Sequence, residues 1–159
     1  MELSEFADKT HLALERGDIM LVKALENIAR QAGDPYYYYW LAWMFEPIGE
    51  AVIEAERKKQ ERQLCKSAAP NPSALIDNID NLLSVKDFVS ANHYFSLAFK
   101  GFIKLAESNS DPDAMSILSD MFSLGLGTAR NSERASYWLD RCYLIRTGMT
   151  FQQWQQRNT

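Results

Sequence analysis

Cysteine and histidine are scarce in this sequence, with two of each among 159 residues. Neither Cys65 nor Cys142 has a partner at Cys-x-x-Cys distance, and His11 and His93 lie outside any metal-ligand spacing. Structural metal sites and disulfide frameworks both need such residues at close, characteristic spacings. We therefore expect free thiols, no metal site and no cofactor.

Catalytic signatures are missing as well. The scattered carboxylates and two histidines suggest no Ser-His-Asp triad and no pair of acids. Gly125-Leu126-Gly127 follows an expected helix and lacks the third glycine and the lysine of a phosphate-binding loop, so it predicts a turn. An enzyme that uses an inserted segment as a lid is a hypothesis that no motif supports, and we expect a protein that is not an enzyme.

Long apolar runs and a basic leader are also absent. No stretch reaches the roughly 18 apolar residues that a membrane span requires. The first residues, MELSEFADKTHLALERGD, carry acids where a secretion signal needs a basic start and an apolar run. A net charge of −4 gives no attraction to phosphate backbones or anionic lipids. These features predict a cytoplasmic protein that binds neither nucleic acid nor membranes.

What the sequence does have is an internal recurrence. DPYYYYWLAWMF from Asp34 and DPDAMSILSDMF from Asp111 share Asp-Pro, Leu and Met-Phe in register, 77 residues apart from Pro35 to Pro112. The match continues upstream, where Ile28-Ala29 corresponds to Leu105-Ala106. Such a period is typical of stacked helical pairs that bury their apolar faces only against their neighbours. With no alternating run for a strand, the sequence predicts a single all-α domain, a short α/α solenoid of antiparallel helix pairs.

Helix start and stop residues divide the chain. Gly17 and Gly33 end helices, and Asp34-Pro35 and Asp111-Pro112 each supply an N-cap followed by a proline at the first helical position. Thr150 with Gln153 resembles a capping box. The helices expected are one from Leu3 to the Gly17 stop, then 19–32, one starting at Pro35, 87–107, 112–124, 132–145 and 151–156. In the second helix the apolar stripe is expected at Leu21, Ala24, Leu25 and Ile28.

Residues 50–84 interrupt the recurrence and are interpreted as an insertion. Residues 50–66 hold four acids and five bases, and a helix that is polar all round is solvated or bridges between elements. The basic run Arg57-Lys58-Lys59 could attract an acidic partner, but acids interleave with it, which favours a solvated face. A linker at 67–73, SAAPNPS, and a short helix at 74–83 follow, and the linker is the expected first site of limited proteolysis.

The segment from Ala114 to Cys142 resembles a Sel-one-like repeat, a relative of the tetratricopeptide repeat. Its matching positions are Ala114, Leu118, Met121-Phe122, Gly125, Gly127, Arg134-Ala135 and Trp138. Its departures are Ser119 for a small glycine, Thr128 for a valine, Asn131 for an aspartate and Cys142-Tyr143 for paired alanines. A second, partial copy matches at Asp87, Ser90-Ala91, Tyr94 and Ala98, and a third, around Leu41 and Met44-Phe45, is cut off at Pro47.

The resemblance implies that small residues let two antiparallel helices approach, and that Gly-x-Gly supplies positive φ in the turn between them. We also expect Trp138 to be buried between the last repeat helices and the 151–154 cap. The family is similar to adaptor and scaffold proteins, and its bacterial members often serve in signalling, secretion or cell competition.

One helix face is aromatic in one copy of the repeat and polar in the other. The expected core positions Tyr37, Leu41, Met44 and Phe45 match Ala114, Leu118, Met121 and Phe122. The positions left outside are Tyr36, Tyr39 and Trp43, which match Asp113, Ser116 and Asp120. Exposed Tyr and Trp dominate protein interface hot spots. We predict partner binding at these six positions, while internal packing of the aromatic stripe under the insertion or the first helix, or self-association, remain alternatives.

Together these features predict a non-catalytic module that binds another protein. An acidic, signal-less protein of this size resembles the immunity proteins that neutralise a cognate toxin in bacterial competition. An adaptor or a secretion-system accessory protein is the alternative. The expected partner is correspondingly a toxin or a secretion or signalling component.

Overall fold

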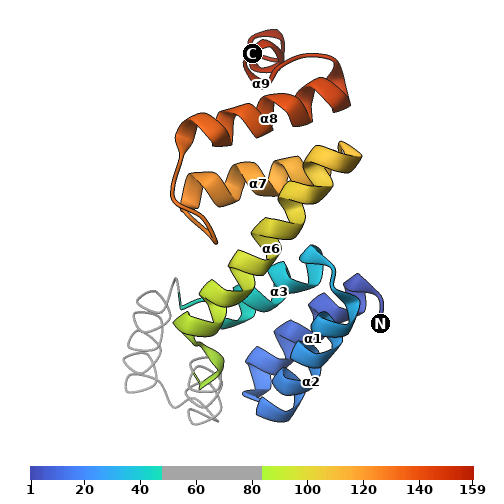
Figure 1. Cartoon of the computed structure of the whole chain (residues 1–159), viewed down its shortest axis with the longest axis vertical. Coiled ribbons are helices and arrows are strands. Elements are labelled where there is room, and N and C mark those ends of the chain that lie inside the picture. The colour runs from blue at the N-terminus through green and yellow to red at the C-terminus, as the bar shows by residue number, and fades with distance from the viewer. Residues whose placement is uncertain (48–83) are drawn as a thin grey trace, which may run out of the picture. The chain divides into compact units, whose positions relative to one another are not determined.

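The described part of the chain is entirely helical. The computed structural model describes residues 1–47 and 84–159, and no strand occurs in those ranges. Its helices are α1 (Leu3–Arg16), α2 (Ile19–Ala32), α3 (Pro35–Phe45), α6 (Phe88–Asn109), α7 (Pro112–Leu124), α8 (Ser132–Thr147) and α9 (Phe151–Arg157), drawn in Figure 1. The all-α prediction is therefore confirmed.

The predicted helix boundaries agree with the structure to within two residues. The 19–32 and 112–124 predictions are met at both ends, and α8 and α9 run two residues and one residue further than expected. The predicted polar helix, the 67–73 linker, the 74–83 helix and Cys65 all lie outside the described residues.

The helices form two compact units. Of the described residues, one unit holds 1–33, 40–47 and 84–91, and the other holds 34–39 and 92–159, so that α3 and α6 contribute residues to both.

In the first unit, α1 and α2 pack as a pair joined by a tight turn. Gly17 adopts the left-handed conformation at φ 59°, and the Asp18 carboxylate accepts a hydrogen bond from the Leu21 N–H at 3.1 Å to start α2. The stripe predicted for α2 is partly wrong. Its buried residues are Val22, Leu25 and Ala29. These three residues follow each other at i, i+3 and i+7 and form one buried face. Ala24 lies outside this face and is exposed.

In the second unit, α7 and α8 pack along each other (Figure 1). The Ser119 hydroxyl donates to the Ala135 carbonyl across this pair at 2.8 Å, and this hydrogen bond is buried. Trp138 is 4% exposed, so its predicted burial is confirmed, whereas its predicted cover by the 151–154 cap stays a prediction. The rings of Phe151 and Trp154 lie against Tyr143, further along α8, with centroids 5.0 and 5.4 Å away. The predicted capping box of Thr150 and Gln153 starts α9.

The same local geometry occurs twice at the sequence recurrence. Gly33 and Ser110 both have positive φ, 61° and 51°, at the end of a helix. The Asp34 carboxylate then accepts from the Tyr36 N–H at 2.9 Å, and the Asp111 carboxylate accepts from the Asp113 N–H at 2.9 Å. The residues that the repeat comparison assigned to the core of α3 and α7 are buried in both helices, except that Tyr37 is half-buried.

Helices α6 and α8 also share a pattern, at a spacing of 44 residues from Asp87 to Asn131. Both residues accept from backbone N–H groups at the start of their helix, Asp87 from Val89 and Asn131 from Arg134. The buried residues correspond in pairs: Ala91 with Ala135, Tyr94 with Trp138, and Ala98 with Cys142. The partial repeat copy in α6 thus buries the same positions as the better-matched copy in α8.

Candidate partner-binding surfaces

In the second unit, the start of α3 lies close against α6. A Cβ atom built on Gly101 would come within 2.6 Å of the Pro35 Cβ, so glycine is what permits this approach. The rings at the start of α3 therefore meet the aromatic side chains of α6.

Two of the three predicted interface aromatics pack on α6. The rings of Tyr36 and Tyr39 make edge contacts with Phe102, at centroid distances of 4.9 and 5.7 Å. Tyr39 also approaches Phe95 at 6.0 Å. Phe95 and Phe102 are fully buried, while both tyrosines are half-buried. Much of each tyrosine ring thus serves internal packing against α6.

Trp43 belongs to the first unit and is also half-buried. It lines a small pocket of about 80 Å³, whose other residues are Thr10, His11, Leu14, Trp40 and Met44. Residues of the first helix thus border the same pocket as Trp43, which favours the packing alternative for this ring. The partner-binding role of the aromatic stripe stays a prediction.

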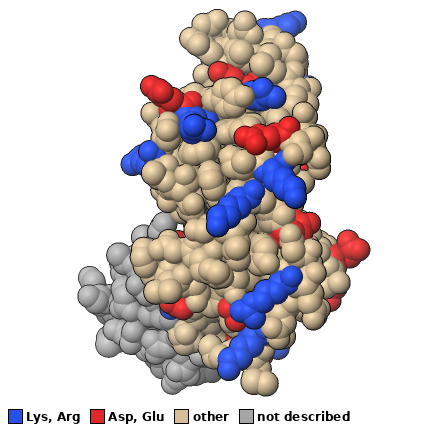
Figure 2. All heavy atoms as spheres, viewed as in Figure 1, with Lys and Arg blue, Asp and Glu red and all other residues tan. Residues whose placement is uncertain are grey.

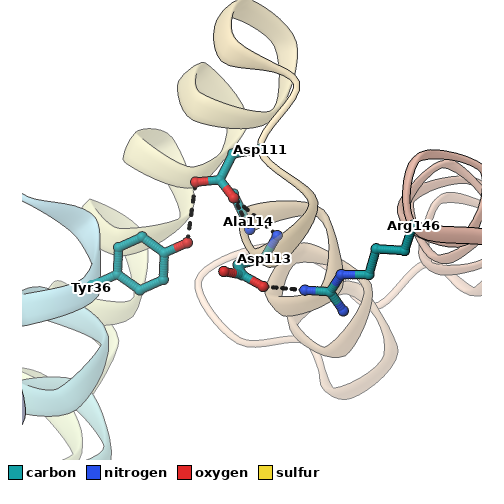
Figure 3. Close-up of polar contacts among 5 residues, drawn as sticks. All are labelled: Tyr36, Asp111, Asp113, Ala114 and Arg146. Atoms are coloured by element: carbon teal, nitrogen blue, oxygen red, sulfur yellow. Dashed lines mark hydrogen bonds and ion pairs between the residues drawn. The ribbon is translucent and has the colours of Figure 1, made fainter.

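A polar chain ties α3, α7 and α8 together (Figure 3). The Tyr36 hydroxyl donates to Asp111 Oδ2 at 3.3 Å, and Asp111 Oδ1 accepts from the Asp113 and Ala114 N–H groups. Asp113 in turn forms an ion pair with Arg146. Burial, and then the negative charge of Asp111, raise the pKa of Tyr36 well above its usual value. Its hydroxyl therefore remains a donor that anchors α3 to the cap of α7.

The three polar positions matched to the aromatic stripe share one face of α7. Asp113 and Asp120 are exposed, and Ser116 is half-buried. Partial desolvation raises the pKa of the Asp120 carboxyl. The ion pair of Asp113 with Arg146 is exposed on both sides, so it contributes little to stability. This face is available for contact, while the tyrosines matched to it are largely used in packing.

An open groove runs along α6 in the second unit, and sequence reasoning missed it. Its volume is about 360 Å³, and its apolar lining comes from Phe99 and Ile103 of α6 and Phe122 of α7. The Phe99 and Phe122 rings meet edge to face at 5.3 Å. The signal in the sequence was the i, i+4, i+8 series Phe99, Ile103, Glu107, whose last members lie in the part of α6 that extends past the repeat match.

The loop between α7 and α8 forms another wall of this groove. Thr128, Ala129 and Asn131 line it, and the Asn131 N–H donates to the Phe122 carbonyl at 2.9 Å. Gly125 and Gly127 both have φ 71°, which confirms the predicted positive φ. A Cβ on Gly127 would lie 2.3 Å from the Phe95 carbonyl oxygen, so the glycine lets the loop rest directly on the α6 backbone.

The groove carries one charge of each sign at its rim. Arg134, in the first turn of α8, has its N–H bonded to the side chain of Asn131, which places it near Phe122 and Phe99. Glu107 lies two helical turns beyond Phe99 along α6, about 12 Å at the usual rise per residue. The groove therefore combines an apolar strip from Phe99, Ile103 and Phe122 with one base and one acid among its lining residues.

Side-chain chemistry elsewhere in the described residues is sparse. Cys142 is 1% exposed, and burial raises the pKa of its thiol, opposed by the positive charge of Arg146. Within residues 1–47 and 84–159, no three His, Cys, Asp or Glu side chains come together in a way that could hold a metal ion. On the face shown in Figure 2, acidic and basic side chains are interspersed among uncharged ones. Among the described helices, none combines the length and apolar character needed to cross a membrane.

Comparisons with protein-family models, with curated proteins and with solved structures find no match for this chain. What the chain binds is therefore inferred from the geometry of these surfaces.

Proposed function

We propose that this chain is a non-catalytic protein-binding module of the helical-repeat type. The paired geometries 77 and 44 residues apart support the repeat interpretation, because caps, positive-φ residues and buried positions correspond and not only letters. The 77-residue spacing, from α3 to α7, includes residues 50–84, whereas the 44-residue spacing, from α6 to α8, does not, as an insertion between the two helices of one repeat requires. The Sel-one-like resemblance remains part of the proposal.

The open groove on α6 is the observation that carries the binding function. Phe99 and Ile103 are half-buried and line the groove together with Phe122. An apolar groove on helices suits the apolar face of a polypeptide segment, most simply a helix laid along it. Arg134 and Glu107 would then orient the segment, with an acid near Arg134 and a base near Glu107.

Within this function, two biological roles stand as proposals. The immunity role predicts that co-expression of this chain protects a cell from the toxin encoded beside it. The adaptor or secretion-accessory role predicts no such protection and a partner from a larger assembly. The exposed residues of α7, Asp113 and Asp120, are candidates for additional contacts in either role.

The proposal is tested by comparing two matched variants in partner capture from the native cell. Ile103 and Ile28 are both half-buried isoleucines on helices, but only Ile103 lines the groove. Ile103→Asp should lose the partner, because a carboxylate would face apolar residues in the groove, whereas Ile28→Asp should retain it. Circular dichroism confirms that both variants fold. Equal capture by both variants would contradict the groove as the binding site.

A further inference from the structure

The small pocket beside Trp43 in the first unit is lined mainly by rings and soft side chains. Two helices supply it, α1 and the part of α3 that belongs to this unit. Its described lining residues are Thr10, His11, Leu14, Trp40, Trp43 and Met44. None of these residues is a lysine, an arginine, an aspartate or a glutamate. We call this space the indole pocket.

The two polar side chains from α1 offer lone pairs to the indole pocket. The Thr10 hydroxyl donates to the Ala7 carbonyl at 2.6 Å, and the His11 Nδ1–H donates to the same carbonyl at 2.9 Å. A neutral imidazole that donates through Nδ1 keeps an acceptor lone pair on Nε2, and a hydroxyl that donates still accepts. The protons of both groups are therefore used within α1, and their lone pairs remain for a ligand.

The other large groups of the pocket are aromatic or polarisable. The His11 and Trp40 rings meet at 5.8 Å with 60° between their planes. Both indoles are half-buried, whereas Met44 is 2% exposed. The π faces of indole rings carry partial negative charge and attract cations more strongly than those of other aromatic side chains. Rings and lone pairs together make the indole pocket electron-rich, which suits a positively charged ligand.

The volume of the pocket limits the size of that ligand. It is about 80 Å³, roughly half of the ~150 Å³ of an engineered cavity that binds benzene in another protein. An aromatic ring is therefore too large, while a compact branched group fits. A trimethylammonium group is compact, positive and covered by methyl groups, and clustered aromatic rings are the usual way in which proteins recognise such groups.

The charge of the first unit also favours a cation. Its described residues carry eight acidic and five basic side chains, whereas the second unit carries seven of each. A net negative charge raises the local concentration of cations and lowers that of anions. A carboxylate or phosphate ligand would meet this field without any lysine or arginine among the described lining residues to bind it.

We propose that the indole pocket binds the trimethylammonium head group of a choline-like ligand. The head group lies against the Trp40 and Trp43 rings, and the lone pairs of Thr10 Oγ1 and His11 Nε2 face its positive charge. The Met44 thioether provides a polarisable contact for its methyl groups. Because so few ligand atoms are bound, we expect dissociation constants in the millimolar range.

Titration with choline tests this proposal through the indole N–H signals in nuclear magnetic resonance spectra of the isotope-labelled chain. The chain has four tryptophans, and two of them line the pocket. Choline should shift the signals of Trp40 and Trp43 and leave those of Trp138 and Trp154 in place. Single replacements of tryptophan by phenylalanine assign the four signals. The titration is done at pH 8, above the range in which imidazole side chains ordinarily take up a proton.

The decisive arm compares choline with 3,3-dimethyl-1-butanol, which has the same shape but a carbon atom in place of the charged nitrogen. This neutral analogue should bind at least about fivefold more weakly, because it loses the attraction between the charge and the rings. The comparison needs no variant. Trp43→Leu should weaken choline binding by a similar factor, whereas Trp154→Leu, at a tryptophan of α9 that is also half-buried, should not. Circular dichroism checks that both variants fold.

A peptide that carries trimethyllysine separates the two sources of such a head group. Tighter binding of the peptide than of choline assigns the head group to a modified protein, and equal or weaker binding assigns it to a small molecule. The proposal is overturned if choline far above the millimolar range shifts neither Trp40 nor Trp43, if it shifts all four signals alike, or if the neutral analogue binds as tightly as choline.

Discussion

Replacement of Gly127 by alanine should disrupt the second unit far more than the same change at another glycine of the same conformation. Gly127, Gly125 and Gly148 have φ values of 71°, 71° and 75°, so an alanine at any of them pays the cost of the left-handed region, about 1–2 kcal/mol. Only at Gly127 would the new Cβ also meet the α6 backbone, at 2.3 Å from the Phe95 carbonyl oxygen and 2.9 Å from the Ser96 nitrogen.

The size of the additional loss follows from what the methyl group meets. At Gly148 no atom lies within 4 Å of the new Cβ, and at Gly125 the nearest lie at 3.6 Å, an ordinary contact. Overpacking costs about 1–3 kcal/mol where side chains can give way, and the obstacle at Gly127 is backbone of a helix. Gly127→Ala should therefore lose at least about 2 kcal/mol more than either control.

Urea unfolding followed by circular dichroism measures the three losses, with unchanged slopes as evidence that the variants unfold in the same way. Equal losses at Gly127 and Gly148 would refute the reasoning. That result would mean that the turn between α7 and α8 does not rest on the backbone of α6, and the wall of the proposed groove would be misplaced.

Three further substitutions test the packing around the candidate surfaces. Trp138→Ala should cost about 3–5 kcal/mol of stability, but Trp138→Phe far less, because the buried indole N–H has no acceptor among the described residues. If the urea midpoints of the two variants fell equally, this N–H would have an acceptor. Tyr36→Phe keeps the ring on Phe102 and removes the hydrogen bond to Asp111, so it should cost about 1 kcal/mol, and less than Asp111→Ala, which also removes the cap of α7; the reverse order would contradict the polar chain. The triple change Tyr36→Asp, Tyr39→Ser, Trp43→Asp should lower the melting temperature markedly, since these rings are half-buried; an unchanged melting temperature with lost partner binding would instead return the interface role to the aromatic stripe.

The helix ends were predictable because their causes are local. Gly17 and Gly33 adopt the left-handed conformation that few other residues tolerate, and Asp111 satisfies N–H groups two and three residues away. Such interactions need no knowledge of the rest of the chain. The capping box at Thr150 was found for the same reason.

The environment of Tyr36 and Tyr39 was not predictable in this way. The repeat logic assigned them to the outer face because their matches on α7, Asp113 and Ser116, are polar. Their actual neighbour, Phe102, is more than 60 residues away in the sequence, and it is reached because Gly101 admits Pro35. The groove was missed for a similar reason, since it needs Phe99, Phe122 and the loop before α8 to come together.

Photo-cross-linking in the native cell tests most directly whether the groove binds a partner protein. A photoreactive amino acid is placed at Ile103, inside the groove, and in a matched variant at Ile28, outside it. Irradiation should join the Ile103 protein to one distinct partner and leave the Ile28 protein without that product, and Arg134→Glu should reduce the yield. The same product from both positions, or no product from Ile103, would contradict the proposal that this groove is where the chain binds another protein.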